Sequence, residues 1–172
     1  MSITEMPPPL PDGFAARLGR CIAGFGFLEE ALKRAIFALS LTGLGQRPDD
    51  RALAAWLHRM EDIADDTLGT LIDQFVKQMG NAGTKGRERL ASDLRAIRRN
   101  RNLLCHASWK ATAVPDRWRP SFINTRGEVF DKDIGDDDLD GILRDTLDAA
   151  TRIIAIMRAT GIEGEWLGHD PD

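Results

Sequence analysis

Apolar residues recur at alternating spacings of three and four along most of this chain, a pattern that predicts amphipathic α-helices. Residues at these spacings form an apolar stripe along one face of a helix. The first stripe predicts a helix over residues 14–41, and the second predicts a helix over residues 50–79. A third helix is expected to begin near Arg87. The last is expected to begin at the aspartates 136–138, which suit a helix N-terminus, and to end at Gly161.

The helical period is absent from residues 109–134, just before the last helix. Residues 122–130 predict two short strands around an Asn-Thr-Arg-Gly turn, and residues 109–114 are a candidate third strand. This segment is too short to build a core of its own. The predicted fold class is therefore mainly α, a four-helix up-and-down bundle with a small β-hairpin insertion before the last helix.

The domain organisation follows from the same pattern. Residues 1–12 contain a proline-rich run and are expected to form an extended N-terminal arm. Residues 13–161 are expected to form a single helical domain, and residues 162–172 a C-terminal tail. We expect no signal peptide and no membrane partner, because no apolar run approaches the roughly 20 residues of a membrane helix. The expected location is the cytoplasm.

The net charge of −4 excludes a general basic surface that would draw the protein to nucleic acid. Contact with RNA or DNA would have to come from a local patch.

Cys21 and Cys105 both fall in predicted helices, which favours buried thiols over a disulfide. No Cys/His spacing suits zinc, and the aspartates at 131–138 lack the order of a calcium loop, so no metal or cofactor is expected.

The stretch from Arg101 to His106 carries the clearest chemistry. Arginine is permanently charged and binds phosphate oxygens through its planar fork. Histidine gives or takes a proton near neutral pH. Asn102 lies four residues before His106, so the two share a helical face. These residues are sufficient for metal-free chemistry on a phosphodiester.

Two charged residues interrupt the apolar stripes. Glu29 lies between Phe25 and Leu32 in the first predicted helix, and Arg101 takes an apolar position in the third. An unpaired buried charge is costly, so the two side chains are candidates for a pair. The sequence leaves open whether they meet.

The run Arg101-Asn102-Leu103-Leu104-Cys105-His106 resembles the Arg-Asn-x-x-x-His motif of the HEPN superfamily. The layout of long helices, with the motif at the end of the third, is also similar to that family, over about residues 13–160. The resemblance implies a metal-independent endoribonuclease, usually a dimer with both motifs in one cleft. Other members have lost cleavage and act as binding or scaffold modules.

The resemblance also implies roles for single residues. His106 would be the general acid or base, Arg101 would bind the scissile phosphate, and Asn102 would orient the imidazole or bind a phosphate oxygen. Glu29 would hold Arg101. The expected function is RNA cleavage by 2′-hydroxyl attack at a homodimer interface, in a toxin or phage-defence effector with an antitoxin or another protein partner. The alternatives are a non-catalytic nucleotide- or protein-binding module and a helical oligomer with only a structural charge pair.

Geometry sets a condition on this site. Residues five apart on an unbroken helix differ by about 140° in direction, so Arg101 and His106 converge only if the helix bends or a second chain contributes.

The sequence offers further candidates around the motif. Arg98, Arg99 and Lys110 are candidate RNA-binding residues, or else part of a solvated face. Trp109 and Trp118 are candidates for stacking on bases or for covering the hairpin, and His58 is expected at the surface.

Overall fold

The computed structural model describes residues 9–45, 48–121, 130 and 132–162. Over these residues it is mainly helical, with a small antiparallel sheet before the last helix, which confirms the predicted fold class. In chain order the elements are α1 (Asp12–Gly43), α2 (Asp50–Ala64), α3 (Leu68–Asn81), α4 (Arg87–His106), β1 (Ser108–Ala111), β2 (Arg117–Ser121), β3 (Ile134–Gly135) and α5 (Asp136–Arg158).

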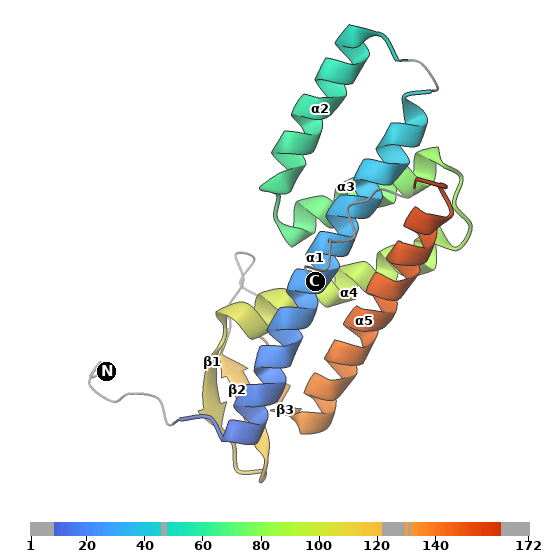
Figure 1. Ribbon diagram of the computed structural model, residues 1–172. Coiled ribbons are helices and arrows are strands. Elements are labelled where there is room, and N and C mark those ends of the chain that lie inside the picture. The colour runs from blue at the N-terminus through green and yellow to red at the C-terminus, as the bar shows by residue number, and fades with distance from the viewer. Residues whose placement is uncertain (1–8, 46–47, 122–129, 131, 163–172) are drawn as a thin grey trace, which may run out of the picture.

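Helix α1 is the long central element, and α5 runs along it while α3 and α4 cover its other sides (Figure 1). Although Ile22 of its predicted stripe is 40% exposed, most of that stripe is buried, with Leu32 and Ile36 fully inside. These side chains share one hydrophobic core with Phe75 of α3 and Leu94 of α4. The core is continuous because each of these helices turns an apolar stripe inward.

The prediction of a single helix over residues 50–79 is wrong, because the structure divides it into α2 and α3. Asp65 and Asp66 end α2, and Thr67 takes an extended conformation as the N-cap of α3, with its hydroxyl accepting from the Thr70 N–H at 3.5 Å. Asp and Thr side chains compete for backbone hydrogen bonds and so favour caps over helix interiors. The apolar spacing continues through this break and hides it.

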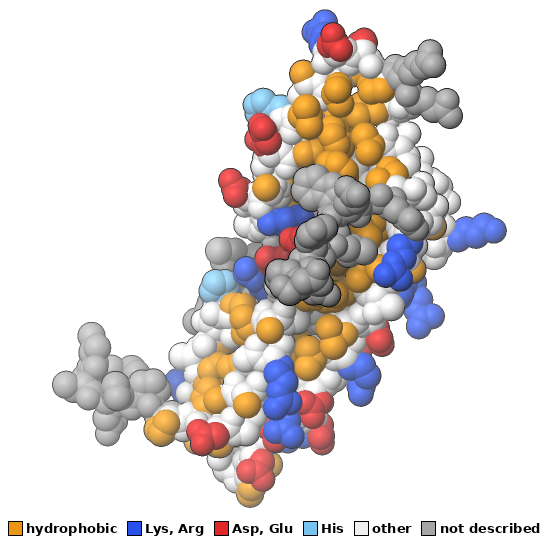
Figure 2. Space-filling view, viewed as in Figure 1, with side chains coloured by type: hydrophobic (Ala, Val, Ile, Leu, Met, Phe, Trp, Pro, Cys, Tyr) orange, Lys and Arg blue, Asp and Glu red, His pale blue; other side chains and the backbone are white. Residues whose placement is uncertain are grey.

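Helix α2 buries Trp56 and Ile63, and the tryptophan packs on α1. The Trp56 ring lies 4.7 Å from the Phe37 ring, and its Nε1 donates to Ser40 Oγ at 2.9 Å. Leu53 and Leu57, expected on the buried stripe, are instead 38% and 49% exposed. They belong to the end of the molecule where Figure 2 shows hydrophobic side chains gathered over α2 and the C-terminal end of α1.

The sheet has the order β1-β2-β3 and lies at the end of the bundle where α4 ends and α1 begins (Figure 1). Phe14 of α1 packs between two tryptophans of this sheet, 5.3 Å from Trp109 and 5.9 Å from Trp118 between ring centroids. Both tryptophans are half-buried there, as expected of residues that cover the hairpin. The strands predicted over 122–129 lie outside the described residues.

The last helix begins at the predicted aspartates. Asp138 accepts hydrogen bonds from the Gly135 N–H at 3.0 Å and from Lys132 and Arg117 at 2.9 Å each. Partial burial alone would raise the pKa of Asp138, but these three donors outweigh it and hold the pKa below its ordinary value.

Among the described residues, no helix is both long and apolar enough to cross a membrane.

Candidate functional site

Helix α4 concentrates positive charge in an otherwise acidic protein. Six arginines and two carboxylates give it a net formal charge of +4, whereas the whole chain carries −4. Its buried stripe includes Leu90, Leu94 and Ile97, and the arginines other than Arg101 occupy the remaining faces. The local patch that nucleic-acid contact would require is therefore present on one helix.

The motif occupies the last turns of α4. Leu103 and Leu104 are buried and anchor this end of the helix in the core, while His106 is exposed. Arg101 and Asn102 are half-buried between these extremes. The helix runs without a break to His106, and the N–H of the next residue still donates to the Leu103 carbonyl at 2.9 Å.

The structure brings Glu29 and Arg101 together. Arg101 Nη2 lies 3.9 Å from Glu29 Oε1, and the two side chains are 31% and 29% exposed. The other guanidinium nitrogen, Nη1, donates to Asn102 Oδ1 at 3.5 Å. Arg101 is thus held between a carboxylate of α1 and an amide of its own helix. Part of its charge faces solvent and can still meet an anion.

Arg101 and His106 point to different sides of α4. Because the helix is unbroken, five residues separate their directions by about 140°. Asn102 is only about 40° from His106 by the same geometry. Within one chain the structure therefore joins Arg101 to Glu29 and Asn102, and places Asn102 on the face of His106.

The candidate RNA-binding residues have different environments. Arg98 Nη1 lies 3.8 Å from Asp73 Oδ2 of α3, and its guanidinium covers Gly69, where a Cβ would come within 2.7 Å of Arg98 Cζ. Arg99 on α4 and Lys110 on β1 are exposed. Arg98 is thus engaged in packing α4 against α3, whereas Arg99 and Lys110 face solvent.

The two thiols differ, and the prediction that both are buried is wrong for Cys105. Cys21 is buried and donates to the Leu139 carbonyl at 3.3 Å. Burial, with the nearby charge of Asp140, raises the pKa of the Cys21 thiol to about 11. Cys105 follows the buried Leu104, but one residue turns about 100° around a helix and carries it off the apolar stripe.

His58 is exposed on α2 as predicted, with its Nδ1 3.4 Å from Asp62 Oδ2. Among the described residues, no group of three or more His, Cys, Asp or Glu side chains is arranged to hold a metal ion.

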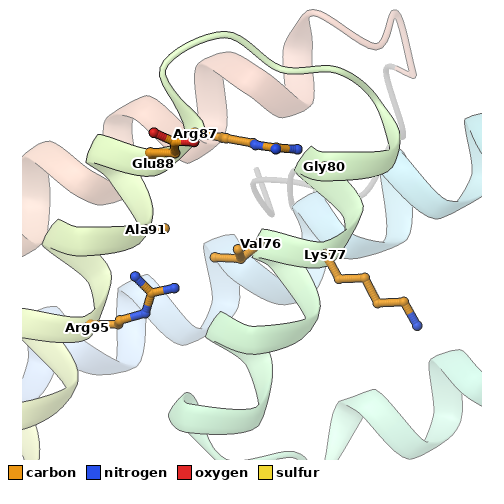
Figure 3. A pocket seen from close by; sticks show the side chains of 7 residues that line it. All are labelled: Val76, Lys77, Gly80, Arg87, Glu88, Ala91 and Arg95. Atoms are coloured by element: carbon orange, nitrogen blue, oxygen red, sulfur yellow. The ribbon is translucent and has the colours of Figure 1, made fainter.

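A groove between α3 and α4 was not predicted. It encloses about 380 Å³ and is lined by Val76, Lys77, Gly80, Arg87, Glu88, Ala91 and Arg95 (Figure 3). The signal in the sequence is the spacing of Arg87, Ala91 and Arg95 at intervals of four, which puts them along one side of α4.

Comparison with known proteins adds no family. No family model matches the chain, and no curated protein or solved structure matches it.

Proposed function

We propose that this protein is a HEPN-like, metal-independent endoribonuclease whose site is completed by a second copy of the chain. The observation that carries the proposal is the arrangement at the end of α4, where Glu29 and Asn102 hold Arg101 half-buried and His106 is exposed on the last turn. The excess positive charge of α4 supports RNA as the substrate.

RNA carries its own nucleophile, the 2′-hydroxyl. In the proposed reaction one His106 takes the proton of that hydroxyl, whose oxygen then attacks the adjacent phosphorus. Arg101 stabilises the additional negative charge on the phosphorane oxygens. The P–O5′ bond breaks, and the leaving oxygen takes that proton back from the same His106. The products are a 2′,3′-cyclic phosphate and a 5′-hydroxyl.

We propose a homodimer because the Arg101 and His106 side chains point in different directions from the same helix. Side chains about 140° apart on one helix do not converge on one phosphate, but Arg101 of one chain and His106 of another can. A mixture of Arg101→Ala and His106→Ala chains tests this. Each mixed dimer regains one intact site, so an equimolar mixture should recover about a quarter of wild-type activity. No recovery would show that the site does not form across chains.

The cleavage itself is tested with RNA in the presence of EDTA. His106→Ala should lower the rate by about 10²–10⁴-fold, the usual worth of a general acid or base. His58→Ala is the matched control, because this exposed histidine lies on α2, and it should cleave like the wild type. Equal rates for wild type and His106→Ala would refute the role of His106.

A biological role as a cytoplasmic toxin or defence effector, with an antitoxin or another protein partner, belongs to the same proposal. Expression of the wild type should then arrest growth, and His106→Ala should relieve the arrest.

The same divergence favours a second candidate, a non-catalytic HEPN-like module that binds a nucleotide or a protein. In that case the wild type cleaves no RNA, while Arg101→Ala still weakens binding of the ligand.

A further inference from the structure

The groove between α3 and α4 is basic and has an apolar floor. Arg87 and Arg95 line it from α4, Lys77 lines it from α3 with its ammonium group pointing away from α4, and Val76 and Ala91 lie between the two helices (Figure 3). In Figure 3 the Arg87 side chain crosses from α4 towards Gly80 of α3, and the Arg95 guanidinium points into the groove. A Cβ at Gly80 would lie 3.1 Å from Arg87 Nη1, so the glycine leaves room for this guanidinium.

Within the described parts of the chain, the cations of the groove have no carboxylate partners. Neither Lys77, Arg87 nor Arg95 forms an ion pair with any described residue, and the lining carboxylate, Glu88, pairs with none of them. Elsewhere, arginines at contacts between helices are neutralised, as in the Arg152–Asp93 pair at 2.6 Å. The two arginines carry like charges that repel each other across the groove, and a bound anion would offset that repulsion.

The groove is aligned with the candidate site. Arg95 precedes His106 by eleven residues, which is about three helical turns, so their directions differ by only about 20°. They are separated by about 16 Å along the axis of α4. Asn102 lies between them on the same face, and the exposed Arg99 adjoins it. A strand laid along this face would pass from the groove to His106.

We infer that the α3–α4 groove, through Arg87 and Arg95, binds the phosphodiester backbone of the RNA strand whose scissile bond lies at His106. This inference rests on the proposed function for the identity of the strand. Contacts to phosphate position a nucleic acid without reading its sequence. The groove therefore sets where the strand lies, and the end of α4 acts on it.

The test measures the affinity for a fluorescein-labelled 2′-O-methyl RNA oligonucleotide, which lacks the attacking hydroxyl and is not cleaved. The double variant Arg87→Ala/Arg95→Ala should bind about tenfold more weakly and flatten the slope of log K against log salt by about 1.4, since each single-strand phosphate contact contributes about 0.7. Arg87→Lys/Arg95→Lys should keep most of the affinity, because charge is the main requirement.

The matched control is Arg20→Ala/Arg144→Ala, which removes from α1 and α5 two exposed arginines that form no ion pair with a described residue. It should bind like the wild type, and thermal melting should show both double variants folded. Equal affinities and salt slopes for wild type and the groove variant would overturn the inference. So would displacement of the oligonucleotide by low-millimolar inorganic phosphate, since that would indicate a site for one phosphate and not for a strand.

Cleavage of unmodified RNA separates the two proposals. If the groove variant loses affinity but the wild type cleaves no RNA, the groove is supported and the nuclease is refuted. If cleavage depends on His106 while the groove variant binds normally, the nuclease is supported and the groove is refuted.

Discussion

Arg101 of α4 lies opposite Glu29 of α1, 3.9 Å from Nη2 to Oε1, at positions where both helices otherwise bury apolar side chains. Each side chain is about one-third exposed, so solvent screens their attraction, and exposed pairs contribute about 0–1 kcal/mol. A pair that stabilises so little yet interrupts two apolar stripes is better explained by what it positions than by the stability it adds.

Replacement of both charges tests that explanation. Glu29→Leu/Arg101→Met should fold with a free energy of unfolding within about 1 kcal/mol of the wild type, because apolar residues of similar volume often replace ion pairs at no cost. The same variant should lose RNA cleavage. Urea denaturation measures the first effect and a cleavage assay the second. Loss of more than about 3 kcal/mol would identify the pair as a structural element instead.

Two glycines of α1 should respond differently to alanine. Gly26 has open space around it, so Gly26→Ala should stabilise the protein by about 0.5–1 kcal/mol through helix propensity. A Cβ at Gly24 would lie 2.9 Å from Leu143 Cδ1 of α5, so the shift of that leucine offsets the same gain, and Gly24→Ala should be about 1 kcal/mol less stable than Gly26→Ala. Denaturation midpoints of the two variants measure the difference, and equal midpoints would contradict the close α1–α5 contact.

The helical bundle could be predicted because its signal is periodic and extends over many turns. The prediction from the sequence was wrong where side chains that favour helix ends interrupt the helical spacing of apolar residues. The residues Asp65, Asp66 and Thr67 end one helix and cap the next, yet the apolar spacing on either side reads as one stripe. The exposed Leu53 and Leu57 continue the same stripe, although no described element buries them.

The candidate site was predictable in part. Glu29 and Arg101 could be paired because each breaks an apolar stripe, and that signal lies within each helix. The basic groove depends on which face of α3 meets which face of α4. Lys77 and Arg87 are close in sequence, but only tertiary packing places them on one groove with Arg95.

Asp138 makes stability depend on pH. Its pKa is lowered in the folded protein, so its contribution is present above the ordinary aspartate pKa of about 3.9 and is lost as the pH falls through the folded value. Asp138→Ala should cost about 1–2 kcal/mol at pH 7, because it removes the carboxylate that accepts from the Gly135 N–H and from two cationic side chains. That cost should shrink towards zero below about pH 4.

Asp137→Ala is the control for this effect. Asp137 is exposed on the same turn of α5 and has no ion pair among the described residues. Its substitution should change the free energy of unfolding by less than about 0.5 kcal/mol at any pH. A pH-independent cost of Asp138→Ala would show that its hydrogen bonds, and not its charge, are what α5 requires.

The thiols of Cys21 and Cys105 should differ in their rate of labelling by iodoacetamide. At pH 8 a thiol with a pKa of about 11 is ionised in about one molecule in a thousand, and Cys21 is also buried, so it should resist iodoacetamide. Cys105 is exposed and should react in the folded protein, whereas both thiols should react in urea. Mass spectrometry identifies the modified residue. Rapid native labelling of Cys21 would contradict the packing of α1 against α5.

Cys105 also provides a test of RNA binding, because it adjoins His106. A bound RNA strand that covers the end of α4 should slow the labelling of Cys105, and Arg101→Ala should abolish that protection.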